Sequence, residues 1–192
     1  MNQPLVLDVE TQFTFQEVGH DCAKLKISVV GTYDYKSGQY RCFREKELPE
    51  LFRAMEHASE IIGFNIRKFD LPVMAPYYLG DLRQFRTIDL LEMVEKSLGH
   101  RVSLDHLAQA TLGSKKSGHG FLAIEYFRSQ QWDKLESYCL DDVRLTKDLY
   151  DYALKNKKLL FQSFNDKAPR EIPLKFETAV ENPVSVHLSL PF

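Results

Sequence analysis

The first apolar segment constrains the fold most, because it must form a buried strand that also carries two acids. Residues 5–10 read Leu-Val-Leu-Asp-Val-Glu. Successive side chains of a strand point to opposite faces, so the odd-numbered apolar residues share one face while Asp8 and Glu10 share the other. Two like charges this close repel, and a divalent cation would remove that penalty because hard cations prefer carboxylate oxygens. The alternative is a strand whose acids face solvent.

The order of the predicted elements indicates an α/β fold. Strand patterns at residues 24–33 and 38–43 flank a turn signal, which predicts an antiparallel hairpin. Two shorter strands are expected at residues 61–64 and 86–88. Helical periods cover residues 47–58, 69–79, 90–98, 103–112, 120–129 and 132–155. Strands that come first, with helices that then predominate, predict a mixed sheet flanked by helices.

Composition changes near residue 160, and the remaining segment shows no helical period. Four prolines punctuate it, at positions 169, 173, 183 and 191. We therefore divide the chain into a globular domain over residues 1–160 and an extended C-terminal tail over residues 161–192, largely mobile in isolation from residue 166.

The charge balance excludes one function class and leaves others open. The chain has 25 Lys and Arg against 27 Asp and Glu, a net charge of -2. Coating of nucleic acid through bulk positive charge is excluded, whereas a local basic rim is not. No apolar run approaches the roughly 18 residues of a membrane helix, and no secretory signal is visible. Three widely spaced cysteines without a CxxC pair predict a reducing, cytoplasmic location and no cysteine zinc site.

A second acid lies where a buried strand gives way to a helix. The strand at residues 61–64 is followed by Asn65, and Phe69 and Asp70 open the next helix. Asp70 either caps that helix or stands at the mouth of the sheet, where strand ends present ligands. Asp89, which follows the next strand, is expected to cap a helix rather than to act as a further ligand.

The last predicted helix carries a tyrosine and an acid on one face. Tyr138 and Asp142 are four residues apart, and leucines at positions 135, 145 and 149 continue near that face. The face therefore points inward, where a carboxylate needs a partner or a metal. Asp141 points elsewhere and is expected to be solvated. The alternative is an exposed Asp142 and a tyrosine that only fills the core.

Taken together in this order, these residues resemble the DEDD superfamily of 3'-to-5' exonucleases, which have a ribonuclease-H-like fold. The family carries an Asp-x-Glu pair on its first strand, matched here by Asp8 and Glu10. Its second motif is an aspartate preceded by an asparagine and an aromatic residue, matched by Asn65, Phe69 and Asp70. This segment is most similar to the proofreading exonuclease of B-family polymerases and its stand-alone bacterial relatives.

The third family motif separates two subclasses. It contains either a tyrosine four residues before an aspartate or a histidine five residues before it. Here Tyr138 precedes Asp142 by four residues and Ser137 stands at the histidine position, so the chain resembles the tyrosine subclass. The resemblance spans residues 4–153, nearly the whole predicted domain.

The resemblance implies hydrolysis of phosphodiester bonds with two divalent cations, Mg²⁺ or Mn²⁺. Asp8 would bridge both ions, while Glu10 and Asp142 would hold the ion that activates water. Asp70 would act on the leaving-group side. Tyr138 would orient the attacking water, because a phenol with an ordinary pKa of about 10 is a poor general base at neutral pH.

Five further residues are candidates for substrate binding, each with a structural alternative. Thr11 could present its backbone amide to the terminal nucleotide, and Phe69 could stack on a base or pack in the core. Asn65 could touch substrate or close a turn. Lys115 and Lys116 lie in a glycine-rich loop and could contact phosphate, although solvated lysines fit the same pattern.

The last six residues, 187–192, resemble the hexapeptide by which bacterial proteins dock on the replicative sliding clamp. Leu188, Leu190 and Phe192 match its apolar positions, while His187 replaces the usual glutamine. Apolar residues on a mobile tail gain energy by entering a partner's groove. The alternative is a tail that packs on its own domain.

The resemblance as a whole implies a metal-dependent 3'-to-5' exonuclease acting on single-stranded or frayed DNA ends, tethered to the clamp in replication or repair. An exoribonuclease with the same site is one alternative, because nothing in the catalytic motifs separates the two sugars. A non-catalytic, nucleic-acid-binding clamp adaptor is another, although it would not require all four carboxylates and Tyr138.

Overall fold

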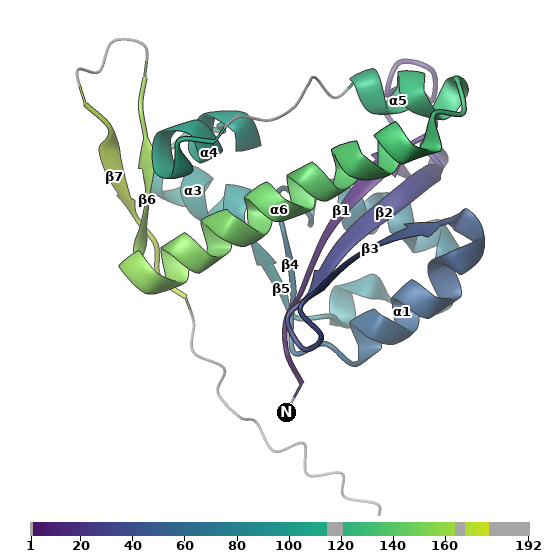
Figure 1. The fold of residues 1–192 in the computed structure, drawn as a ribbon, viewed down its shortest axis with the longest axis horizontal. Helices are drawn as coiled ribbons and strands as arrows, with labels where there is room; N and C mark the ends of the chain where they lie inside the picture. Colours follow the sequence, from purple (N-terminus) through teal and green to yellow (C-terminus); the bar gives the residue numbers. More distant parts are fainter. Residues whose placement is uncertain (1, 115–120, 164–167, 177–192) are drawn as a thin grey trace, which may run out of the picture.

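A five-stranded mixed sheet forms the centre of the protein, with helices on both faces (Figure 1). The computed structural model describes residues 2–114, 121–163 and 168–176. The sheet has the strand order β3-β2-β1-β4-β5. Its strands are β1 (Leu5–Thr11), β2 (Ile27–Asp34), β3 (Gln39–Arg44), β4 (Ile61–Gly63) and β5 (Thr87–Asp89). β2 pairs antiparallel with β1 and β3, whereas β1, β4 and β5 run parallel, so the predicted mixed sheet is confirmed.

The described residues form six α-helices, in the predicted order. They are α1 (Leu48–Glu56), α2 (Asp70–Met74), α3 (Leu90–Leu98), α4 (Leu104–Leu112), α5 (Phe121–Arg128) and α6 (Trp132–Asn156). The helix expected at residues 69–79 is shorter, because α2 gives way to a 3-10 turn at Ala75–Tyr77. Pro76 lacks the amide hydrogen that a longer α-helix would need there.

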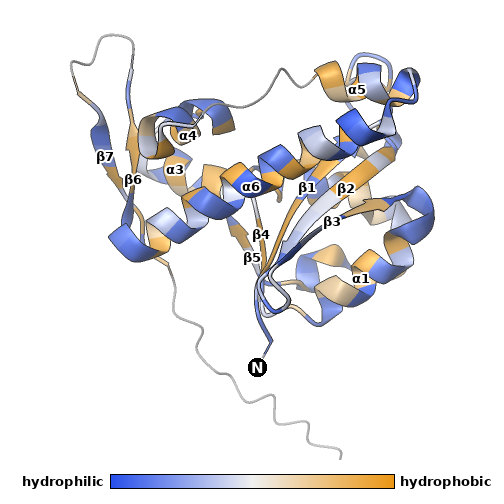
Figure 2. Cartoon of the chain, in the orientation of Figure 1, coloured by the Kyte–Doolittle hydropathy of each residue, from blue (hydrophilic) through white to orange (hydrophobic). Residues whose placement is uncertain are grey.

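Both faces of β1 are covered, which is why its apolar run is almost continuous. Leu5, Leu7 and Val9 are buried in a cluster with α1 and α2, while Val6 packs in a second cluster with α6. Each fully buried leucine contributes about 1.5–3 kcal/mol to folding. Figure 2 shows mostly hydrophobic residues in β1 and β4, whereas α1 and α6 carry hydrophobic and hydrophilic residues in turn. Residues two apart on a strand share a face, so Asp8 lies on the same face as Val6, the face that α6 covers.

A glycine sets how closely α6 approaches the sheet. A Cβ atom added at Gly31 on β2 would lie 2.8 Å from the Sγ of Cys139 and 3.0 Å from a methyl group of Val143. Real Cβ atoms do not approach neighbours so closely, so any other residue would push the helix away. An isolated glycine inside a strand is the sequence signal for such a close approach.

The C-terminal segment differs from the expected extended tail. Strand β6 (Lys158–Phe161) pairs antiparallel with β7 (Arg170–Pro173), and both Ile172 and Leu174 are buried against the domain. The boundary drawn at residue 160 thus falls inside a strand, and the prediction of a tail from residue 166 was wrong for residues 170–174. Prolines do not prevent this pairing, because a strand in a two-stranded sheet has a free edge.

Residues 164–167 and 177–192 of the predicted tail lie outside the described part of the chain, so their extended conformation stays a prediction. Among the described residues, no helix combines the length and the apolar character needed to cross a membrane.

Candidate active site

The two acids of β1, Asp8 and Glu10, lie in its C-terminal half, and both are half-buried. Glu10 pairs with Val29 of β2, but Thr11 pairs with Ile27, so Ser28 is an extra residue opposite this point. Such a β-bulge increases the local twist and re-aims neighbouring side chains, and bulges are frequent beside active sites. The bulge therefore lies where the strand presents Glu10.

Helix α6 brings a third carboxylate to the same place. Asp8, Glu10 and Asp142 each offer an oxygen, and these oxygens lie within 4.8 Å of one another. Asp142 is only 4% exposed. Three ionised carboxylates at this spacing repel by about 3 kcal/mol per pair at an effective dielectric constant of about 20. This donor set of oxygen ligands fits hard divalent cations such as Mg²⁺ or Mn²⁺, which would offset the repulsion.

Asp70 is buried beside this cluster, with 2% exposure. It does not cap its helix, since the capping position belongs to Phe69. Its Oδ1 accepts a hydrogen bond of 2.9 Å from the backbone amide of Val9, beyond the short pairing of β1 with β4. Burial raises the pKa of Asp70 well above its ordinary value, and the charge of Asp8 raises it further, while the hydrogen bond from Val9 lowers it.

The loop before Asp70 is held by Asp89, which is 3% exposed. Its carboxylate accepts backbone hydrogen bonds from Asn65 (2.9 Å) and Arg67 (3.1 Å), and it caps α3 through the amide of Glu92 (3.2 Å). The predicted capping role is thus confirmed. Asn65 has a φ of 69°, a left-handed conformation that asparagine tolerates better than most residues. Asp89 therefore fixes the turn that positions Asp70.

Tyr138 lies on the inward face of α6, as predicted, and is 4% exposed. The next residue, Cys139, contacts the cluster directly: its Sγ donates to the backbone oxygen of Asp8 at 3.6 Å and lies 3.9 Å from the Oδ2 atom of the same residue. Burial and the charge of Asp8 raise the pKa of this thiol, so it stays protonated and can donate. No sequence pattern singled out Cys139, because its partner is distant in the chain.

Three of the predicted substrate-binding residues belong to the described part of the chain. Thr11 is buried, and its hydroxyl donates to the carbonyl oxygen of Phe13 at 3.0 Å. The side-chain oxygen of Asn65 accepts from Arg101 at 2.7 Å. Phe69 is half-buried, with its ring centroid 5.8 Å from that of Phe15. The predicted substrate and partner residues outside the described part of the chain are Lys115, Lys116, His187, Leu188, Leu190 and Phe192.

Comparison with protein families identifies the fold and its lineage. A family profile described as the RNase H superfamily matches residues 5–154, which include all four carboxylates and Tyr138. The chain belongs to the RNase H superfamily. No curated protein matches the sequence significantly.

Among solved structures, this RNase H superfamily chain is similar to the family B DNA polymerase from the hyperthermophilic archaeon Pyrobaculum calidifontis. The TM-score is 0.62 at 16% identity, and the similar region covers 80% of this chain but 25% of the polymerase. The chain thus corresponds to about a quarter of that enzyme. The likeness establishes the shared fold.

The raised pKa of the buried Asp70 predicts that the stability of the folded protein depends on pH. An aspartate in the unfolded chain has a pKa of about 3.9, and folding raises the pKa of Asp70 above that value. At a pH between the unfolded and the folded pKa, the folded protein therefore binds more protons than the unfolded chain. Stability of the metal-free protein should fall as pH rises through that window and stay reduced above it. Asp70→Asn should therefore raise the metal-free Tm at pH 7, with each kcal/mol gained worth about 2–4 °C.

Thermal unfolding from pH 4 to pH 8, with EDTA and with Mg²⁺, measures this effect. Mg²⁺ should stabilise the parent at pH 7 and the variant less. Asp141→Asn, at a half-exposed position on α6, is the matched control and should follow the parent. A variant with the same pH profile as the parent would contradict the expectation.

Proposed function

We propose that this chain is a metal-dependent 3'-to-5' exonuclease of the tyrosine subclass of the DEDD superfamily, acting on single-stranded or frayed DNA ends. The observation that carries the proposal is the meeting of Asp8, Glu10 and Asp142 within 4.8 Å, beside the buried Asp70. Membership of the RNase H superfamily supports a nuclease. The choice of DNA rests on the likeness to a DNA polymerase and on the clamp-like tail.

Each residue has a proposed role in hydrolysis. Asp8, Glu10 and Asp142 would hold two Mg²⁺ or Mn²⁺ ions, with Asp70 beside them on the leaving-group side. The bound ions would supply a nucleophile at neutral pH and offset the charge that develops on the phosphate. Tyr138 would hydrogen-bond the attacking water and fix its direction toward phosphorus. Cys139 would hold Asp8 through the thiol hydrogen bond.

Digestion of matched 5'-labelled single-stranded DNA and RNA with Mg²⁺ tests the proposal. A ladder that shortens from the 3' end is expected for DNA, and a 3'-phosphate-blocked strand and a circular strand should resist. Faster digestion of RNA would favour the exoribonuclease, since the 2'-hydroxyl distinguishes the two substrates. Cleavage of the circle would exclude an exonuclease. Binding without cleavage of any strand, with either metal, would favour the non-catalytic adaptor.

Tyr138→Phe removes one hydroxyl group and should separate the orientation of water from metal binding. We expect kcat to fall by about ten- to a hundredfold, the usual effect of misplacing a reacting group. The Mg²⁺ concentration for half-maximal activity should not change. Tyr152→Phe, a matched change further along α6, should leave both values unaltered. A large rise in the Mg²⁺ requirement of Tyr138→Phe would show that this tyrosine supports the metal ligands instead.

The clamp tether is proposed from the sequence of residues 187–192, where Leu188, Leu190 and Phe192 would enter an apolar groove of the clamp. A tether would raise the effective concentration of the enzyme at primer ends. Deleting residues 186–192 should abolish binding to an immobilised bacterial clamp and leave digestion of free oligonucleotides unchanged. Equal clamp affinity before and after the deletion would contradict the tether.

A further inference from the structure

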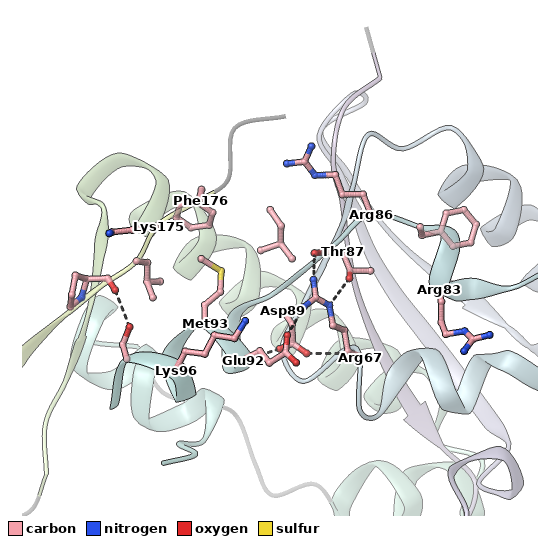
Figure 3. Close-up of a pocket in the computed structure, with 15 residues that line it drawn as sticks. Arg67, Arg83, Arg86, Thr87, Asp89, Glu92, Met93, Lys96, Lys175 and Phe176 are labelled. Carbon is pink, nitrogen blue, oxygen red and sulfur yellow. Dashed lines mark hydrogen bonds and ion pairs between the residues drawn. The ribbon is translucent and has the colours of Figure 1, made fainter. Parts of the chain in front are cut away.

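A groove lies along the open edge of the central sheet, next to β5. It has a volume of about 790 Å³, and its walls come from β5, α3 and the segment that follows β7. Figure 3 shows Lys175 and Phe176 on one side and Arg67, Thr87 and Arg86 on the other, with Met93 and Lys96 between them. The hydroxyl of Ser97 donates to the carbonyl oxygen of Pro173 at 3.1 Å and joins two of the walls. The two walls are thus in direct contact at one end of the hairpin.

The rim of the groove is positively charged, although the whole chain carries a net charge of -2. Five cationic side chains line it, against the two acids Asp89 and Glu92. Its three arginines are ion-paired, with Glu92, Asp81 and Glu60 as their partners. Lys96 and Lys175 form no ion pair with any residue in the described part of the chain. Two lysines are therefore available to an anionic ligand.

Apolar side chains lie between these charges. Met93, Ile88 and Phe85 line the groove from the side of the sheet and α3, and Phe176 lines it from the opposite side. Single-stranded nucleic acid suits such a surface, since its phosphates pair with lysines while the faces of its bases contact aromatic and apolar groups. A peptide of acidic and apolar residues has partly similar chemistry, but the position of the groove favours a polynucleotide.

The groove lies close to the carboxylates of the candidate active site. Arg67 and Asp89 line the groove, and both belong to the hydrogen-bonded turn that positions Asp70. Neighbouring strands lie about 4.8 Å apart, so β5 is about 10 Å from β1, which carries Asp8. A strand whose 3' end reached the carboxylates could extend into the groove within a few nucleotides.

One wall of the groove lies beyond the part of the chain that the family profile matches. The RNase H superfamily profile ends at residue 154, whereas Lys175 and Phe176 follow the β6–β7 hairpin. The burial of Ile172 and Leu174 fixes that hairpin against the domain. The hairpin and the residues after it thus supply one wall of the groove.

We propose that this groove binds the backbone of single-stranded nucleic acid, a few nucleotides upstream of the 3' end, through Lys96 and Lys175. The proposal rests on the proposed nuclease function for its direction, but binding can be measured without turnover. The groove would lengthen the grip on the substrate and so favour longer strands over very short ones.

The test is the charge-reversed double variant Lys96→Glu with Lys175→Glu, compared with Lys36→Glu combined with Arg53→Glu. All four side chains belong to exposed residues, and the control pair lies on the β2–β3 turn and on α1, away from the groove. Fluorescence anisotropy of a labelled oligo(dT) of about twelve nucleotides in EDTA gives Kd without cleavage. The groove variant should raise Kd at least about tenfold at about 50 mM salt, and it should reduce the magnitude of the negative slope of log K against log salt by about 1.4.

Turnover separates this proposal from the function on which it rests. The groove variant should keep the kcat and KM of the parent on a dinucleotide, which is too short to reach the groove. An unchanged Kd for the oligonucleotide would overturn the proposal that the groove binds nucleic acid. An equal loss of affinity in the control pair would overturn it too. So would binding of an acidic peptide in the groove in place of the oligonucleotide. Reduced binding by the groove variant in a chain that cleaves nothing would support the groove while the exonuclease proposal failed.

Discussion

Replacing Asp8 with asparagine is expected to reduce metal-dependent hydrolysis about a thousandfold or more. The oxygens of Asp8 lie within 4.8 Å of those of Glu10 and Asp142, so its charge is central to any cation held there. Losing one charged ligand removes several kcal/mol of transition-state stabilisation, and about 1.4 kcal/mol corresponds to tenfold in rate. Asparagine has the same shape and keeps an oxygen for the Cys139 thiol, so the fold should persist. Initial rates of ladder formation at saturating Mg²⁺ measure the loss.

The same substitution should not destabilise the metal-free protein, because it removes repulsion among three carboxylates. Circular dichroism and thermal unfolding in EDTA verify that the variant is folded. Asp141→Asn is the matched control, since Asp141 is the neighbour of Asp142 on α6 but forms a surface ion pair with Arg144. If Asp8→Asn retained activity comparable to this control, the carboxylate cluster would not be the active site.

Gly31→Val should have the largest effect on stability. The Cβ of any side chain at this position would lie 2.8 Å from the Sγ of Cys139 and 3.0 Å from Val143, and valine adds two more methyl groups. Overpacking of a core usually costs about 1–3 kcal/mol, and we expect the upper end or more because a backbone oxygen lies 3.4 Å away as well. Displacement of α6 would also move Asp142 relative to β1, so activity should fall with stability. Urea unfolding gives the stability change through the shift of the midpoint.

A rescue experiment shows whether the clash with Cys139 is the cause. Gly31→Ala is the milder change, and Cys139→Ala removes the nearest atom. Combining the two should cost less than the sum of the single changes, with a coupling of about 0.5–3 kcal/mol as seen for residues in contact. Strict additivity would show that the clash with the Cys139 side chain is not the cause of the destabilisation.

Most elements of the fold could be predicted because they follow short-range periodicity. The alternation in residues 5–10 placed Asp8 and Glu10 on one face, and helical spacing placed Tyr138 and Asp142 on one inward face. The pairing of β6 with β7 was missed, because β6 is short and directly follows α6, while β7 has a single buried apolar residue between two prolines. Its stability comes from burial against helices distant in the sequence.

The candidate site also contains residues that the sequence could identify and residues whose roles only the structure shows. The four carboxylates and Tyr138 could be selected because their family motifs are short. Asp89 holds the turn at Asn65, and Cys139 holds Asp8. Both roles depend on hydrogen bonds between elements far apart in the chain. No local pattern encodes such contacts, so Asp89 was expected only as a helix cap.

The sequence by itself determined which side chains share a face, since strand and helix periods act over a few residues. Only the tertiary structure decided which faces meet and how closely. Gly31 admits α6 to β2, and that approach brings Asp142 from the helix to Asp8 and Glu10 on the strand. The groove beside β5 likewise has one wall that comes from the residues after the β6–β7 hairpin, which packs against α3. Close packing makes such distances depend on particular side chains that are remote in sequence, which is why no local pattern can specify them.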